Sequence, residues 1–272
     1  MTYQSGVRMV SVCMITYNHE AFIREAIEGV LMQQTSFPIE LVIGEDFSTD
    51  RTRAICEDYA ENHPEIIRLL PSEKNLGMMP NFIRTLQAGT GKYISLCEGD
   101  DYWTDPMKLQ KQVAILENDP ETGLCYTDVD FYYQETGKFA RSVFENGIKK
   151  RYTDYLDFLI NMGYLAPLTW VFRRDVFDTF ELGEPTDGSF VMMLEFLRKS
   201  KVYYINEVTG VYRKHKHGVS KRNNDYRSYK QWKGVFETQK MYISKYEVDE
   251  KSRIKILRSE EHTSELQSRH NL

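Results

Sequence analysis

Three carboxylates stand within four residues directly after a strongly apolar run. In YISLCEGDDYWTDP the run YISLC is followed by Glu98, Asp100 and Asp101. Acids this close repel one another, so a positive group is needed to neutralise them. Carboxylate oxygens suit a hard divalent cation, which then keeps water and takes substrate phosphates as further ligands. The alternative is a solvated turn whose acids cap a helix that begins at Asp105 and Pro106.

The acidic cluster follows a series of alternating strand and helix patterns in the first half of the chain. Continuous apolar runs indicate strands buried on both faces, and stripes of apolar residues at helical spacing separate them. This βαβαβαβ order predicts an α/β fold with a Rossmann-like, mostly parallel central sheet flanked by helices. The strands are expected at 9–16, 40–46, 66–70 and 93–97, and the helices at 18–33, 48–62 and 81–89, with Ser48 or Thr49 capping the second helix.

Polar residues follow three of these strands. Ligands of parallel α/β sheets bind beyond the carboxyl ends of the strands, so the three groups should meet in space although they lie far apart in the chain. They are Thr16-Tyr17-Asn18, Glu45-Asp46 and the segment from Glu98 to Asp101.

The second half of the chain is less regular. We expect a helix at 106–119, an antiparallel or edge strand at 123–133, a short strand leading into a helix at 168–177, a helix at 188–200 and a strand or bent hairpin at 202–213. The segment 221–257 is predicted to be an amphipathic C-terminal helical extension. Trp103 and Trp170 either stack on a sugar or fill the core.

Composition restricts the functional classes. The 272 residues, 41% hydrophobic, can bury a sizeable core. A net charge of −5 gives no electrostatic footprint for nucleic acid. Four scattered cysteines without CxxC spacing indicate reduced thiols in a cytoplasmic protein. We find no leader and no run of 18 apolar residues, so we expect a soluble protein and leave peripheral membrane association open.

The last fifteen residues differ from the rest of the chain. RSEEHTSELQSRHNL, residues 258–272, has almost no apolar content, and its first eleven residues resemble the translation of a common sequencing adaptor. We interpret 258–272 as adaptor-derived and exclude it from fold reasoning, and we expect the natural chain to continue beyond Leu257. The alternative is a genuine polar tail.

The motifs at the strand ends carry a family resemblance. No GxGxxG follows the first strand and no GxxxxGK[ST] occurs. Instead, TYN follows the first strand and EDFSTDRT follows the second. The fourth strand is followed by the acids and an aromatic residue. From about Val10 to Ser220 the chain resembles the family 2 glycosyltransferases of the GT-A fold, whose strands end in TYN-like, DDGSTDxT-like and DxDD motifs. We therefore expect a GT-A catalytic domain over 1–220.

The resemblance implies a donor site built from these motifs. Thr16 and Tyr17 would line the base pocket, and Asp46 would accept a hydrogen bond from N3–H of uracil. The loop KNLGMMPNF matches the family segment that positions ribose and diphosphate. The alternatives are an N-terminal helix charge for Asp46 and an ordinary strand-to-helix turn for the loop. The implied donor-binding residues are Thr16, Tyr17, Asn18, Asp46, Asn75, Gly77, Glu98, Asp100 and Arg213.

The resemblance also implies a divalent cation, Mn²⁺ or Mg²⁺. Asp100 is the principal expected ligand, with Asp101 and His215 as further ligands and Glu98, where the family usually has aspartate, facing the ribose or a metal-bound water. Arg213, in the YR-x-H spacing, would bind the diphosphate. A solvated basic loop is the alternative for VYRKHKHGVS.

An inverting transfer needs a base that deprotonates the acceptor hydroxyl. The family supplies an acidic residue before a later helix, and EPTDGSFVMMLEF offers Asp187, with Glu184 as the fallback. The alternative for Asp187 is a plain helix N-cap.

These residues predict an inverting, metal-dependent glycosyltransferase. Its donor would be a nucleotide-diphospho sugar, most simply a UDP-sugar, and its acceptor a glycan or lipid-linked glycan in surface polysaccharide synthesis. Two rivals remain open. A sugar-1-phosphate nucleotidylyltransferase should carry a Gly/Arg-rich phosphate loop after the first strand, which TYNHEAF lacks. A sugar-nucleotide-binding module without catalysis would bind the donor but show no turnover.

Overall fold

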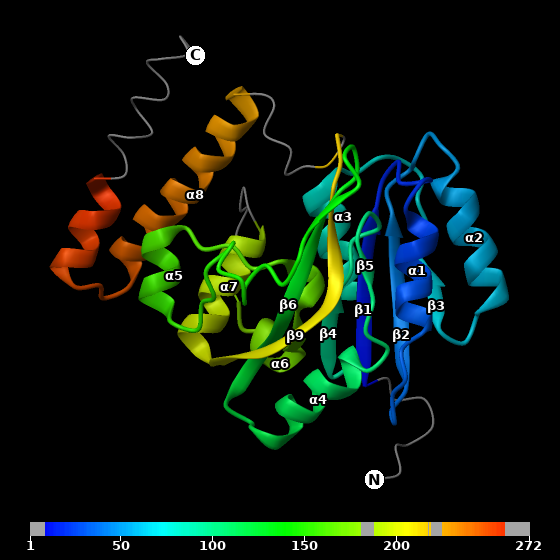
Figure 1. Ribbon diagram of the computed structural model, residues 1–272, viewed down its shortest axis with the longest axis horizontal. Helices are drawn as coiled ribbons and strands as arrows, with labels where there is room; N and C mark the ends of the chain where they lie inside the picture. Colours follow the sequence, from blue (N-terminus) through cyan, green and yellow to red (C-terminus); the bar gives the residue numbers. More distant parts are fainter. Residues whose placement is uncertain (1–8, 181–187, 217, 219–224, 259–272) are drawn as a thin grey trace.

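The computed structural model describes residues 9–180, 188–216, 218 and 225–258. Within them one nine-stranded sheet is flanked by helices (Figure 1). The strands are β1 Val10–Thr16, β2 Ile39–Glu45, β3 Ile67–Leu69, β4 Tyr93–Leu96, β5 Tyr102–Trp103, β6 Thr122–Tyr133, β7 Lys138–Ala140, β8 Val171–Arg173 and β9 Lys201–Lys214. They lie in the order β3-β2-β1-β4-β8-β6-β9-β5, and β7 pairs with β6.

The helices alternate with the strands in the first half and gather at one end of the sheet in the second half. They are α1 Ile23–Leu31, α2 Thr52–Asn62, α3 Met78–Ala88, α4 Lys108–Asn118, α5 Tyr155–Asn161, the 3₁₀ turn η1 Pro167–Thr169, α6 Arg174–Phe177, α7 Gly188–Lys199 and α8 Asp225–Lys245.

The first half of the sheet is parallel, as predicted from the order of elements. β1 pairs in parallel with both β2 and β4, and β2 pairs in parallel with β3. Every residue of β2 is buried, as its continuous apolar run predicts. The register places Thr16 opposite Glu45, so the polar residues that follow β1 and β2 begin at the same level.

Helices cover both faces of this parallel half. The thiol of Cys13 in β1 donates to the carbonyl of Thr85 in α3 at 3.6 Å. Thr16, whose side chain points to the opposite face of the strand, lies near Ile23 of α1, and Gly99 fits between them. A β-carbon at Gly99 would lie 2.5 Å from Thr16 Oγ1 and 3.1 Å from Ile23 Cδ1, so only glycine fits this position.

The start of α2 differs from the sequence expectation. α2 begins at Thr52, and neither Ser48 nor Thr49 caps it, so that prediction is wrong. Both residues instead bond to Asn18 in the loop after β1, while Asp50 accepts from the amide of Thr52. The sequence could not reveal this because the partner loop is distant in the chain.

The second half of the sheet is mixed. β6 is antiparallel to β8 and β7, as expected, but it is not an edge strand, because β9 pairs with it in parallel on its other side. Ten consecutive residues of β6 are buried, from Thr122 to Phe131. Neighbours on both sides and packing on both faces explain this burial, although the alternating pattern of its sequence suggested an exposed face.

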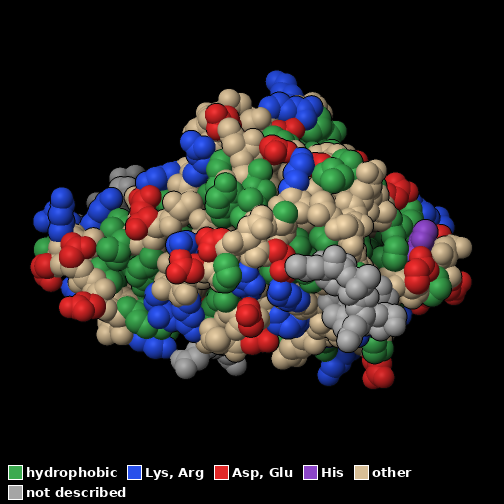
Figure 2. All heavy atoms as spheres, turned by 90° about the horizontal axis from the view of Figure 1, so that it is seen from below, with side chains coloured by type: hydrophobic (Ala, Val, Ile, Leu, Met, Phe, Trp, Pro, Cys, Tyr) green, Lys and Arg blue, Asp and Glu red, His purple; other side chains and the backbone are tan. Residues whose placement is uncertain are grey.

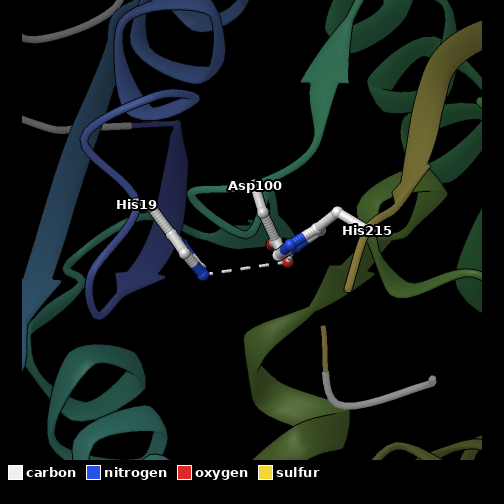
Figure 3. Close-up of side chains that lie close together, drawn as sticks. All are labelled: His19, Asp100 and His215. Carbon is white, nitrogen blue, oxygen red and sulfur yellow. Dashed lines mark hydrogen bonds and ion pairs between the residues drawn. The ribbon is translucent and has the colours of Figure 1, made fainter. Parts of the chain in front are cut away.

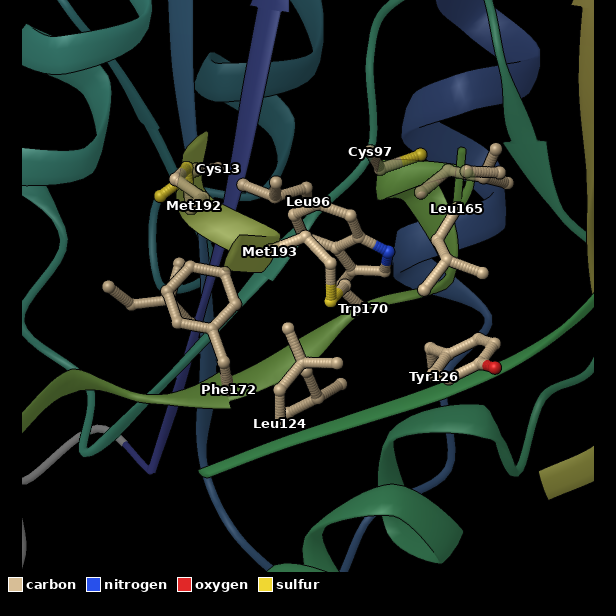
Figure 4. Close-up of a cluster of buried hydrophobic side chains, with 14 of the residues drawn as sticks. Cys13, Leu96, Cys97, Leu124, Tyr126, Leu165, Trp170, Phe172, Met192 and Met193 are labelled. Carbon is tan, nitrogen blue, oxygen red and sulfur yellow. The ribbon is translucent and has the colours of Figure 1, made fainter. Parts of the chain in front are cut away.

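A cluster of buried side chains lies where the two halves of the sheet meet (Figure 4). Trp170 and Phe172 lie there beside Leu96 and Leu124, and Trp170 is 1% exposed. Trp103 is also buried, and its indole donates to the carbonyl of Leu168 at 2.9 Å. Both tryptophans therefore fill core and neither is available to stack on a sugar.

The described segment after β9 is helical over α8 and again over residues 250–258. Gln239 of α8 donates to the carbonyl of Leu159 in α5, and Tyr242 donates to Glu195 of α7 at 2.7 Å. These bonds attach α8 to the end of the sheet occupied by α5 and α7 (Figure 1). No helix in the described ranges is both long and apolar enough to cross a bilayer. On the face seen in Figure 2, acidic and basic side chains are interspersed.

A lysine lies fully buried in this core. Lys108 is 0% exposed, its ammonium lies 4.4 Å from the centre of the Trp103 ring, and it donates to Gln112 at 2.7 Å. Burial lowers the pKa of Lys108 from 10.5 to about 7. The unfolded chain therefore binds a proton more readily than the folded chain between these two pH values.

This difference predicts a pH-dependent stability. Because the pKa of Lys108 is lower in the folded state, folding stability should rise with pH above 7, by at most about 1.4 kcal/mol per pH unit from this group. Lys108→Met should remove that increment, measured as the difference in free energy of unfolding between wild type and variant at pH 7 and 8.5. Lys111→Met, on the same helix but partly exposed, is the control. Equal pH slopes in wild type and Lys108→Met would contradict the prediction.

Candidate donor and metal site

The loops after β1 and β2 are joined by hydrogen bonds between side chains and backbone. The amide of Asn18 donates to Ser48 Oγ at 2.9 Å, and the amide of Thr49 donates to Asn18 Oδ1 at 2.9 Å. The amide of His19 donates to Thr52 Oγ1 at 2.8 Å. The motifs TYN and EDFSTDRT therefore form one surface at the carboxyl edge of the sheet, with Thr16 buried and Tyr17 exposed on it.

Asp46 connects this surface to the loop before α3. Its Oδ1 accepts from the amide of Leu76 at 2.8 Å, and its Oδ2 accepts from the amide of Gly77 at 2.9 Å. Asn75 donates to the Asp46 carbonyl at 2.8 Å. Gly77 has φ +86°, a conformation that glycine adopts without strain. The structure thus brings Asp46, Asn75 and Gly77 together, and each Asp46 oxygen retains acceptor capacity for a ligand.

The acidic turn after β4 lies directly against β1. The amide of Gly99 donates to the carbonyl of Ile15 at 2.9 Å, and the amide of Asp101 donates to the carbonyl of Glu98 at 3.0 Å. The turn therefore presents Asp100 beside the loop that follows β1, where His19 lies.

Asp100 meets two histidines there (Figure 3). His215 Nε2 lies 3.0 Å from Asp100 Oδ2, and His19 Nε2 lies 3.8 Å from the same oxygen. One ligand atom from each residue lies within 4.8 Å of the others. The three residues come from different segments, namely the loop after β1, the turn after β4 and the end of β9. Two imidazoles and a carboxylate form a donor set that suits a divalent metal ion.

A polar atom without a partner supports this fit. His215 is buried, and its Nδ1 has no hydrogen-bond partner among the described residues. The three side chains differ from a solvated acidic turn, because two basic groups from distant segments converge on one carboxylate oxygen. Metal ligation explains the convergence better than helix capping does.

The electrostatics of the cluster keep Asp100 ionised. Burial opposes its ionisation, but the hydrogen bond from His215 and the nearby histidine charges outweigh burial and lower the pKa of the Asp100 carboxyl. Burial lowers the pKa of His19 and outweighs the charge of Asp100, which raises it, so the neutral imidazole is favoured. An ionised carboxylate beside the neutral imidazole of His19 is a protonation state that binds a metal ion.

Glu98 and Asp101 have a different environment. Burial, followed by the charge of Asp100, raises the pKa of Glu98 to about 7. Burial and the charges of Asp100 and Glu98 raise the pKa of Asp101 well above its usual value. Glu98 Oε2 and Asp101 Oδ2 are both buried without a hydrogen-bond partner in the described structure. Asp101 Oδ1 accepts from the amide of Arg213 at 2.7 Å, so this oxygen anchors β9, and Asp101 is not among the three clustered ligands.

Arg213 lies below the cluster and is 7% exposed. Its guanidinium donates to the carbonyl of Asp100 at 2.9 Å, to Gln134 at 2.8 Å and to Glu25. These contacts use three of the five N–H donors of the guanidinium and hold it beside Asp100. The contact with the diphosphate that the sequence suggested stays a prediction.

Two expected residues and one unexpected residue complete the comparison with the sequence. Asp187 and Glu184, the candidates for the base, lie outside the described residues. His19 was not predicted. Its position directly after TYN, at a strand end already assigned to ligand binding, could have indicated a role in the site. Its contact with Asp100 spans 81 positions and depends on the order of strands in the sheet, so the sequence alone does not reveal it.

The fold and the polar edge together define the class of protein. A parallel Rossmann-like half, joined to a mixed half and carrying an acidic turn at the carboxyl edge, is the arrangement of GT-A glycosyltransferases. The chain belongs to glycosyl transferase family 2, because the model of that family, Glycosyl transferase family 2, matches residues 11–180.

A curated relative is similar to this chain over most of its length. The uncharacterized protein Rv1520 of Mycobacterium tuberculosis is 35% identical over 212 residues, which cover 77% of this chain and 60% of that protein. The chain thus spans about 60% of the length of this curated relative.

Solved structures share the fold. The Staphylococcus aureus TarS fragment 1–349, in complex with UDP-GlcNAc, matches with a TM-score of 0.69 at 18% identity, covering 92% of this chain and 70% of that one. The mannosyltransferase PcManGT of Pyrobaculum calidifontis, in complex with GDP-Man and Mn²⁺, matches with a TM-score of 0.65 at 19% identity, covering 95% and 70%.

The cluster predicts a measurable metal affinity. His19→Ala and His215→Ala should each weaken Mn²⁺ binding by about tenfold or more, since even changes around a ligand cost about 10–100-fold. Isothermal titration with Mn²⁺ measures this effect. His63→Ala, which removes the histidine that follows α2, is the matched control and should bind Mn²⁺ as the wild type does. Unchanged affinity in both cluster variants would exclude the histidines as ligands.

Proposed function

We propose that this chain is the catalytic part of an inverting, metal-dependent glycosyltransferase that uses a nucleotide-diphospho sugar. The observation that carries the proposal is the convergence of His19, Asp100 and His215 at the carboxyl edge of a family 2 fold. A metal ion bound by these residues would neutralise the charge that develops on the departing diphosphate.

The nucleoside would occupy the surface formed by the loops after β1 and β2. Thr16, Tyr17 and Asn18 supply one side of it and Asp46 the other. Two backbone amides donate hydrogen bonds to Asp46 and fix the orientation of its carboxylate. A ring N–H of the base would therefore bind an acceptor that is already oriented. A uracil base has such a donor, which supports UDP as the nucleotide. The loop at Asn75 and Gly77 would contact the ribose and diphosphate.

Three further residues would arrange the diphosphate end. Glu98 would face the ribose or a metal-bound water. Asp101 and Arg213 would hold the acidic turn in place through the bonds described above. Two imidazole ligands favour Mn²⁺ over Mg²⁺, because Mg²⁺ prefers oxygen ligands and Mn²⁺ accepts nitrogen more readily.

The acceptor hydroxyl would be deprotonated by Asp187, with Glu184 as the fallback. The carboxylate would take the proton as the hydroxyl oxygen attacks the anomeric carbon in line with the departing diphosphate, which inverts the configuration. The acceptor would be a glycan or lipid-linked glycan, and a cytoplasmic location, at the inner face of a membrane where the acceptor is lipid-linked, suits both substrates.

A donor screen tests the proposal. The chain is incubated with UDP- and GDP-sugars, candidate acceptors and Mn²⁺ or Mg²⁺, and release of the nucleotide diphosphate is measured. Asp100→Ala should weaken metal-dependent donor binding about tenfold or more because it removes a ligand. Asp187→Asn should retain donor binding but reduce turnover by about 10²–10⁴-fold because it removes the base.

The outcomes separate the alternatives. Full activity in both variants would exclude this mechanism. Donor binding without turnover across acceptors would indicate a binding module, and pyrophosphate release from a nucleoside triphosphate and a sugar-1-phosphate would indicate a nucleotidylyltransferase.

A further inference from the structure

Phe47 has a strained backbone at the carboxyl end of β2. Its φ is +60°, in the left-handed region that favours glycine and that bulky side chains rarely adopt. Asn18, at the equivalent position after the paired strand β1, has φ +55°. Asparagine adopts this region more readily than phenylalanine does, so the conformational cost falls mainly on Phe47.

The surrounding hydrogen bonds hold Phe47 in this conformation. On one side the amide of Asp46 donates to the carbonyl of Thr16 at 3.0 Å, which extends the strand pairing by one residue. On the other side the amide of Ser48 donates to Glu45 Oε1 at 2.6 Å. Strain that the neighbouring structure enforces in this way is found most often at ligand sites.

The Phe47 side chain gains little from the fold in return. It is 50% exposed, and no ring or cation packs on it in the described part of the chain. A strained backbone conformation at a residue that buries little surface is better explained by ligand binding than by a contribution to stability.

Further exposed apolar residues lie in the segments next to Asp46, which bonds to Thr16 and to Leu76. Tyr17 follows the strand end paired with Glu45 and is 44% exposed, while Leu76 and Met78 are 37% and 47% exposed. The amide of Leu76 donates to Asp46, and Phe47 follows Asp46 in the chain, so apolar residues adjoin a buried, oriented hydrogen-bond acceptor. An apolar rim around one fixed polar group matches a nucleobase, which has flat apolar faces and a polar edge.

We propose that Phe47 is a base-stacking residue whose ring, together with Tyr17, packs against the nucleobase of the donor nucleoside diphosphate. The inference rests on the proposed function and adds a specific residue to it. The left-handed backbone at residue 47 would direct an aromatic ring outward where a glycine would leave an open edge.

Titration calorimetry with UDP, GDP and inorganic pyrophosphate, each with Mn²⁺, tests the inference. Phe47→Gly should weaken binding of the preferred nucleoside diphosphate about tenfold, the range of base–aromatic stacking, and leave pyrophosphate affinity unchanged. Its melting temperature should be equal to or higher than that of the wild type, because glycine relieves the positive φ. Phe47→Tyr, which retains the ring, should bind as the wild type does.

Two further variants complete the design. Phe47→Leu keeps the strained backbone and an apolar side chain but removes the ring, and it should lose affinity as Phe47→Gly does. Phe139→Ala removes a comparably exposed aromatic residue of β7 and should bind both ligands normally.

Each remaining outcome would overturn the inference. Unchanged nucleotide affinity in Phe47→Gly and Phe47→Leu would exclude stacking, and an equal loss of pyrophosphate affinity would assign Phe47 to loop structure. A wild-type chain that binds pyrophosphate but neither UDP nor GDP would overturn the stacking role and the proposed function. Nucleotide affinity that is the same in the wild type and in the Phe47 variants would overturn the stacking role but leave the proposed function intact.

Discussion

The site depends on a contact between the end of β9 and the acidic turn after β4. The bond from His215 to Asp100 joins residues that are 115 positions apart. Arg213 strengthens the contact, because its amide binds Asp101 and its guanidinium binds the Asp100 carbonyl. Three carboxylates within four residues would otherwise repel one another. The end of β9 thus supplies a guanidinium and an amide donor that hold the turn in place.

Several features of the fold could be predicted from the sequence, because they depend on local periodicity and element order. The four parallel strands and their connecting helices follow from apolar runs and helical stripes, and the position of ligands follows from the direction of parallel strands. Asp46, Asn75 and Gly77 lie together beyond the end of β2, and their contacts with a donor stay a prediction.

Features that depend on distant partners could not be predicted. Ser48 and Thr49 are residue types that often cap helices, yet they form hydrogen bonds with Asn18 and neither caps α2. His19 and the buried guanidinium of Arg213 acquire their roles only from neighbours across the sheet. The interior position of β6 likewise requires knowledge of β9, which lies some 70 residues later in the chain.

The parallel pairing of β6 with β9 has a kinetic consequence. This pairing joins segments far apart in sequence, and long-range parallel pairing forms slowly because loop-closure entropy is lost before contacts compensate for it. His215 and Arg213 stand at the far end of β9, so they reach the acidic turn only after that pairing is complete. During synthesis the parallel half can therefore assemble first, and the cluster of His19, Asp100 and His215 is completed only when β9 has paired.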